Sequence, residues 1–295
     1  MDKQVQRFYQ KGLNANAKGN WLQALQHFRK CTQLDETCSQ AYYEIGMLYY
    51  KHGQHEEALE YMQKAVEHNT SNVQIHFALA NIYLMSEQPQ KAIEIYHEIE
   101  QFNEEPTPAL YLNLGIAYGA VGDNQKAIFY LEKSINLAPH NIEALNSLGK
   151  IYFDMDHLDK AKAIFQRVIR LNPNYPGGHQ MLGHVYAKEA QWEKAIHEWD
   201  QVLAVFPKRE EILHYIGRAW GKLNEYERAI SMLKKVLDIN PANVQARLDL
   251  GVIFLSTRLY DHAIQEFKYA ERLDPGNPII KQLLKDATKI KKIYR

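Results

Sequence analysis

Three short segments begin with the His-Glu pair that zinc hydrolases place on a helix. They are HEEAL from His55, HEIEQ from His97 and HEWDQ from His197. A zinc site of this kind needs a second histidine four residues after the first, so that both imidazoles share one helical face. None of the three segments has it, and the sequence shows no glycine-rich phosphate loop or nucleophile elbow. We therefore expect no catalytic residue, no metal and no cofactor in a protein that is not an enzyme.

A second set of side chains that could do chemistry is cationic and evenly spaced. Lys150, His184 and Arg218 follow one another at intervals of 34 residues. If the chain repeats its structure at that interval, they form one seam, and cations that converge on a concave surface attract an acidic segment. Over the whole chain the charges balance, with 35 Lys and Arg against 35 Asp and Glu. This balance argues against nucleic acid as a partner.

Composition narrows the class of protein. Of the 295 residues, 46% are hydrophobic, which is enough for a core and too many for a disordered chain. No apolar run approaches the ~20 residues of a membrane span, and the N-terminal segment lacks the apolar stretch of a signal peptide. Cys31 and Cys38 are the two cysteines, which fits a reducing compartment. These features predict a cytoplasmic protein without a membrane span.

The elements that would carry these side chains recur with a period of 34 residues. A column of small residues has successive gaps of 34, 34, 35, 34, 34, 34 and 34, and an independent column of alanines has the same gaps. The small residues are Gly12, Gly46, Ala80, Gly115, Gly149, Gly183, Gly217 and Gly251. The alanines are Ala24, Ala58, Ala92, Ala127, Ala161, Ala195, Ala229 and Ala263. Apolar residues three and four apart predict amphipathic helices, and the small residues mark close helix crossings.

At these positions the chain resembles the tetratricopeptide repeat family, whose unit is a 34-residue helix–turn–helix. The fifth repeat carries the family pattern in Leu148-Gly149, Tyr152, Ala161, Phe165 and Pro173. The resemblance implies an all-α, right-handed solenoid of eight helical hairpins over residues 1–277. Residues 278–295 are predicted to form an amphipathic capping helix. The predicted repeats are 5–38, 39–72, 73–106, 108–141, 142–175, 176–209, 210–243 and 244–277.

One residue is inserted between the third and fourth repeats, within FNEEPTPALYLNLG. We expect it in a loop, with Thr107 as a helix N-cap and Pro108 in the first helical turn, where its missing N–H costs nothing. A tolerated loop insertion is the simpler interpretation. A hinge near Pro106 and Pro108 is the alternative.

The resemblance also implies a function, because the first helix of each repeat in this family lines a concave groove that binds a peptide segment of a partner. The first half of that groove is predicted to be largely apolar, and the second half basic. The apolar half comprises Tyr9, Leu13, Tyr43, Met47, Phe77, Asn81, Leu112, Asn113 and Ile116. The basic half comprises Asn146, Lys150, Gln180, His184, Lys188, His214, Arg218 and Lys222. An apolar or amphipathic segment followed by an acidic one would fit.

Particular residues bear on other functions. Some family members clamp a chaperone's C-terminal carboxylate with two asparagines and several cations. Asn81 and Asn113 match the asparagines, but Phe77, Glu143 and Ser147 stand at the cation positions. A homo-oligomeric scaffold, in which the groove takes a neighbouring copy, is the first alternative. A single-stranded RNA reader is less favoured, because such repeats are longer and basic.

Overall fold

The computed structural model describes residues 2–102 and 107–293, and these residues form seventeen α-helices and no strand. The predicted all-α class is confirmed. The first helices of the hairpins are α1 (Lys3–Ala17), α3 (Ser39–Lys51), α5 (Val73–Met85), α7 (Pro108–Ala120), α9 (Ile142–Asp154), α11 (Pro176–Lys188), α13 (Glu210–Lys222) and α15 (Val244–Ser256). The second helices are α2 (Trp21–Leu34), α4 (His55–His68), α6 (Pro89–Phe102), α8 (Asn124–Leu137), α10 (Leu158–Leu171), α12 (Trp192–Val205), α14 (Tyr226–Ile239) and α16 (Tyr260–Leu273), and α17 (Pro278–Ile293) follows them.

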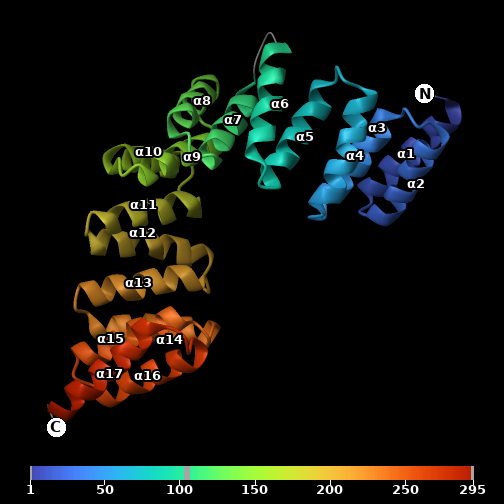
Figure 1. The fold of residues 1–295 in the computed structure, drawn as a ribbon. Helices are drawn as coiled ribbons and strands as arrows, with labels where there is room; N and C mark the ends of the chain where they lie inside the picture. The colour runs from blue at the N-terminus through green and yellow to red at the C-terminus, as the bar shows by residue number, and fades with distance from the viewer. Residues whose placement is uncertain (1, 103–106, 294–295) are drawn as a thin grey trace. The chain divides into compact units, whose positions relative to one another are not determined.

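These helices belong to two compact units, Met1–Ile151 and Tyr152–Arg295. Within each unit, consecutive helices pack as hairpins and each hairpin stacks on the next, as in the series α11 to α16 (Figure 1). The helices are short, so their stability depends on burying an apolar stripe against neighbours. The stacked hairpins supply that burial and make each unit a helical solenoid.

The column of small residues lies where the two helices of a hairpin cross, as predicted. A Cβ atom added to Gly115 would lie 2.5 Å from Leu131 Cγ, which is closer than real Cβ contacts come. A Cβ atom on Gly251 would meet the ring of Phe267, which is fully buried. Because the glycines have no side chain, large apolar groups of the second helix can fill the space beside the first.

The turn inside each hairpin contains one residue with a positive φ angle, and these residues also recur every 34 or 35 positions. They are Gly19, Gly53, Glu87, Gly122, Asp156, Ala190, Asn224 and Arg258. The following N–H then reaches back to a carbonyl near the end of the first helix, as when Gln191 N donates to Tyr186 O at 2.8 Å. This left-handed helix end satisfies carbonyl groups that the helix leaves open. Most of these turns use a residue other than glycine.

The start of α7 confirms the predicted roles of Thr107 and Pro108 beside the insertion. Thr107 is the N-cap and its hydroxyl oxygen accepts a hydrogen bond from Leu110 N at 3.2 Å, with Pro108 in the first turn. The first residue of α7 is 35 positions after that of α5, whereas later first helices begin 34 apart. Pro106, the other proline of the segment, lies outside the described residues.

Helix α17 begins 34 residues after α15, at the position of the first helix of a further hairpin. It packs against α16 and buries Ile280 and Ala287. Lys285 stands where the earlier repeats have the small residue of the crossing, as at Gly251. This substitution puts a long charged side chain where a second helix would have to approach. Among the described helices, none is both long and apolar enough to cross a membrane.

Candidate peptide-binding face

Side chains of consecutive first helices contact one another along one side of each unit, which we call the inner face. The contacts join residues 32 or 35 positions apart, so they link neighbouring repeats. They are Tyr9 Oη to Glu44 Oε1 at 3.4 Å, Asn113 Nδ2 to Asn81 Oδ1 at 2.7 Å, and His214 Nε2 to Asp249 Oδ2 at 2.7 Å. In all, these pairs involve three of the side chains predicted for the apolar half and one predicted for the basic half.

In the first unit, the inner face near α1 and α3 contains a carboxylate that the sequence analysis did not include. Glu44 lies beside Tyr9, and burial raises the pKa of this carboxyl group. Burial, reinforced by Glu44, raises the pKa of Tyr9 to about 12, and the same two causes raise the pKa of Tyr43. This part of the face is therefore aromatic but also polar, with tyrosine hydroxyl groups that stay protonated at neutral pH.

The two asparagines predicted for the apolar half, Asn81 and Asn113, bond to each other. Asn81 Oδ1 accepts hydrogen bonds from Tyr96 Oη at 2.5 Å and from Asn113 Nδ2 at 2.7 Å. Tyr96 is fully buried, and Phe77 packs edge-on against its ring with centroids 5.7 Å apart. Because Asn81 Oδ1 already accepts from two groups of the chain, this amide is less available to a peptide backbone than a solvent-exposed one.

Burial separates the remaining residues predicted for the apolar half. Leu13, Met47 and Ile116 are half-buried and keep part of their surface at the inner face. Leu112 is buried, with 6% of its surface exposed, so it is a core residue and offers little to a ligand. Less apolar surface is therefore accessible in this half than if Leu112 were exposed.

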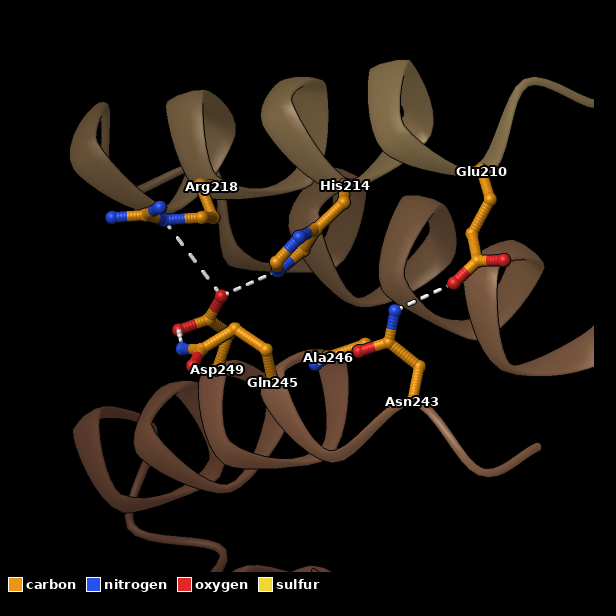
Figure 2. Close-up of polar contacts among 7 residues, drawn as sticks. All are labelled: Glu210, His214, Arg218, Asn243, Gln245, Ala246 and Asp249. Atoms are coloured by element: carbon orange, nitrogen blue, oxygen red, sulfur yellow. Dashed lines mark hydrogen bonds and ion pairs between the residues drawn. The ribbon is translucent and has the colours of Figure 1, made fainter. Parts of the chain in front are cut away.

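In the second unit, a carboxylate of α15 holds two side chains of α13. Figure 2 shows His214 and Arg218 pointing from α13 toward Asp249. His214 Nε2 is 2.7 Å from Asp249 Oδ2, and Arg218 Nε is 3.7 Å from the same oxygen. Gln245 Nε2 donates to the other carboxylate oxygen at 3.3 Å. Asp249 thus neutralises part of the predicted basic seam, while 54% of the Arg218 side chain stays exposed.

Beside this group the second unit has a hollow of about 290 Å³, which we call the aromatic hollow. Its lining includes rings from the end of α9, from α11, from α12 and from α13. The ring of His184 stands edge-on to Tyr215 at 4.7 Å, and Tyr215 stacks on Trp199 at 5.5 Å. Phe153 forms another part of the wall.

Of the basic residues predicted for this unit, His184, Lys188, Arg218 and Lys222 line the aromatic hollow, whereas His214 does not. Lys188, Arg218 and Lys222 line it, and Lys188 Nζ also bonds to Asp156 Oδ1 at 3.0 Å. Burial lowers the pKa of His184 from its ordinary value near 6.5, only partly opposed by Glu211, so this imidazole is neutral at pH 7. The hollow therefore has three cations and one neutral histidine.

The other residues predicted for the basic half are divided between the two units. Gln180 is half-buried on α11 of the second unit. Lys150 is exposed on α9 and belongs to the first unit, as does Asn146. Asn146 is buried, with 9% of its surface exposed.

One further histidine, His179, and the two cysteines are buried within the helical hairpins. His179 is buried between Glu198 Oε2 at 2.7 Å and the carbonyl oxygen of Pro173 at 2.8 Å. Cys31 and Cys38 are buried free thiols, and burial raises the pKa of Cys31 to about 11. Over residues 2–102 and 107–293, no three His, Cys, Asp or Glu side chains form a group that could hold a metal ion.

Three family profiles match the chain. Tetratricopeptide repeat protein 21 C-terminal ARM domain matches residues 16–109, and two tetratricopeptide repeat profiles match 120–176 and 216–278. The chain belongs to the tetratricopeptide repeat family. The photosystem I assembly protein Ycf3 of Rippkaea orientalis is 36% identical over 59 residues, which are 19% of this chain and 34% of that protein. The alignment thus spans about a third of the relative's length.

Solved structures show the same fold. A tetratricopeptide repeat protein fragment from Cytophaga hutchinsonii has a TM-score of 0.66 at 16% identity, covering 82% of this chain and 99% of its own. A second, from Parabacteroides merdae, has a TM-score of 0.61 at 17% identity, covering 85% and 98%. The APC/C hetero-tetramer Cut9–Hcn1 contains a chain with a TM-score of 0.63 at 16% identity; 92% of this chain matches 54% of that one. This chain therefore spans about half of that protein's length.

Proposed function

We propose that the protein is a non-catalytic scaffold of the cytoplasm that binds peptide segments of a partner protein on its inner face. The observation that carries the proposal is the aromatic hollow, because it combines a concave surface, half-buried rings and cations on the first helices. Clefts that are mainly apolar with a few fixed polar groups are the usual form of binding sites. Here no reactive pair of nucleophile and base accompanies them, so binding rather than turnover is the function that the site supports.

The two units differ in the segments they would take. The first unit offers Tyr43, Met47 and Phe77, which suit an apolar or amphipathic segment. The second unit offers Lys188, Arg218 and Lys222 around aromatic rings, which suit an acidic segment. Side-chain pairs such as His214–Asp249 hold parts of the face in place and so reduce the ordering cost of binding.

An array of immobilised 12-residue peptides, probed with the labelled full chain, tests the proposal. We expect two sets of binding peptides, one apolar and one acidic. The same peptides, added free in solution, should compete with the immobilised peptides of their own set for the chain. The acidic peptides should also bind more weakly as the salt concentration rises, because salt screens their contacts with lysine and arginine side chains. Absence of binding to any array peptide, together with concentration-dependent light scattering of the chain alone, would favour the self-assembling scaffold instead.

A further inference from the structure

The size of the aromatic hollow restricts what can occupy it. Its volume of about 290 Å³ lies just below the range of ligand sites, which is roughly 300–1,000 Å³. The hollow therefore suits one or two side chains of a peptide rather than a cofactor. Its lining comes from consecutive hairpins of a single unit, so the repeat stacking itself shapes the space.

The floor of the hollow is suited to another aromatic ring. His184 stands at 90° to Tyr215, and Tyr215 lies at 27° to Trp199, so the floor already contains both edge-to-face and stacked pairs. An added ring can continue either arrangement, because aromatic pairs favour edge-to-face and offset-stacked geometry. The pKa of His184 is lowered by burial, and its neutral imidazole does not repel or attract a charge strongly.

The rim of the hollow carries three cations, and the carboxylates that pair with two of them, Asp156 with Lys188 and Asp249 with Arg218, lie outside its lining. Lys188, Arg218 and Lys222 are among the lining residues, and none of the lining residues is a carboxylate. Lys188 Nζ lies 4.5 Å from the centroid of Phe153, so one cation is already held over a ring. A basic peptide would meet like charge here, whereas carboxylates next to an inserted ring would meet opposite charge.

We propose that the aromatic hollow binds an aromatic side chain flanked by Asp or Glu residues in the partner segment. The ring packs on Tyr215 and His184, and the neighbouring carboxylates pair with Arg218 and Lys222. This inference rests on the proposed function, since it names the residue type that anchors the acidic segment in the second unit.

Three fluorescein-labelled peptides test the chemistry by fluorescence anisotropy with the full chain. The first has one Phe flanked by two Asp and two Glu in a Gly-Ser background. The second replaces Phe by Ala, and the third replaces the acidic residues by Asn and Gln. We expect the first peptide to bind at least tenfold more tightly than each of the others, because ring and carboxylates act together.

Two variants tie the preference to this hollow. Ala187→Phe fills the hollow without a change of charge and should remove the preference for Phe over Ala, while the Ala peptide keeps its affinity. Tyr215→Leu removes part of the floor and should reduce the same preference if Ala187→Phe does not fold. Arg218→Gln with Lys222→Gln should weaken the first peptide at least tenfold. The matched control, Lys234→Gln with Lys235→Gln on exposed positions of α14, should change affinity less than twofold.

Each contrary result is distinct. Equal affinity for the Phe and Ala peptides, or an unchanged preference in a folded Ala187→Phe protein, would overturn the inference and leave the scaffold function standing. An equal loss of affinity in the α14 control variant would also overturn the inference, because the effect of charge on binding would then be non-specific. Absence of binding to these peptides and to every array peptide would overturn the proposed function as well.

Discussion

His214 Nε2 lies 2.7 Å from Asp249 Oδ2, although the two residues are 35 positions apart and belong to successive hairpins. The same carboxylate oxygen lies 3.7 Å from Arg218 Nε. One acidic side chain thus contacts two basic side chains of the preceding repeat. The effective charge of the inner face depends on these pairs, and counting Lys, Arg and His along the sequence overstates it.

Asp249→Asn should therefore strengthen the binding of acidic peptides. Removing this carboxylate frees Arg218 and adds one positive charge to the inner face, while the amide can still bond to His214. We expect a gain of about 1 kcal/mol or less, as for other exposed ion pairs, and a steeper dependence on salt. Fluorescence anisotropy at several salt concentrations measures both. Asp238→Asn, at an exposed position of α14, makes the same change of charge and should leave affinity unaltered.

Ala190→Gly should stabilise the second unit. Ala190 has φ of 57°, a left-handed conformation that costs an L-residue about 1 kcal/mol and glycine almost nothing. The reciprocal change, Gly53→Ala, should destabilise the first unit by a similar amount, since Gly53 has φ of 73°. Urea unfolding curves of each variant check the sign. A loss of stability for Ala190→Gly would contradict a strained turn at that residue.

Gly251→Leu should destabilise the protein by about 1–3 kcal/mol, because the new side chain would overlap the buried ring of Phe267. The control is Gly276→Leu, where no atom lies within 4 Å of the position of a Cβ atom. Thermal unfolding followed by circular dichroism compares the two. Similar melting temperatures would show that α15 and α16 do not cross as closely as described.

The stability of the second unit should fall as the pH falls from 7 toward 5. Burial lowers the pKa of His184 in the folded chain, so below pH ~6.5 the unfolded chain binds more protons than the folded chain. The free energy of unfolding therefore decreases as the pH falls through that window. His184→Gln should reduce this dependence when urea unfolding is followed by tryptophan fluorescence. An identical pH dependence in both proteins would mean that His184 does not titrate differently on folding.

Much of the fold could be predicted because packing imposes a residue type at a fixed interval. Gly251 is small because Phe267 occupies the space beside it, and Thr107 caps α7 through a short-range bond that the sequence TPAL indicates. The left-handed turn residues were missed, although they recur as regularly. Their conformation is set by the return of the chain into the second helix, so Ala190 and Arg258 adopt it despite their own preference.

The site was predicted less completely, since register specifies the face of a helix but not the partners of each side chain. The column of first-helix positions placed His214 and Arg218 in the same half of the groove, and both point toward Asp249 in the structure. It could not show that Asp249 bonds to both, that Leu112 is buried, or that His184 lies among rings. These outcomes depend on rotamers and on neighbours about 35 residues away. Aromatic residues at Trp199 and Tyr215 were the available signal for the hollow.

Hydroxyl-radical footprinting of the full chain, with and without peptides selected from the array, tests the central claim most directly. Bound peptide should protect inner-face rings, with Tyr43 and Phe77 shielded by apolar peptides and Tyr215 by acidic ones. Phe129 and Tyr269, which are exposed on the second helices α8 and α16, should be oxidised at the same rate in both samples. Protection of Phe129 or Tyr269, with Tyr43, Phe77 and Tyr215 unchanged, would contradict peptide binding on the inner face.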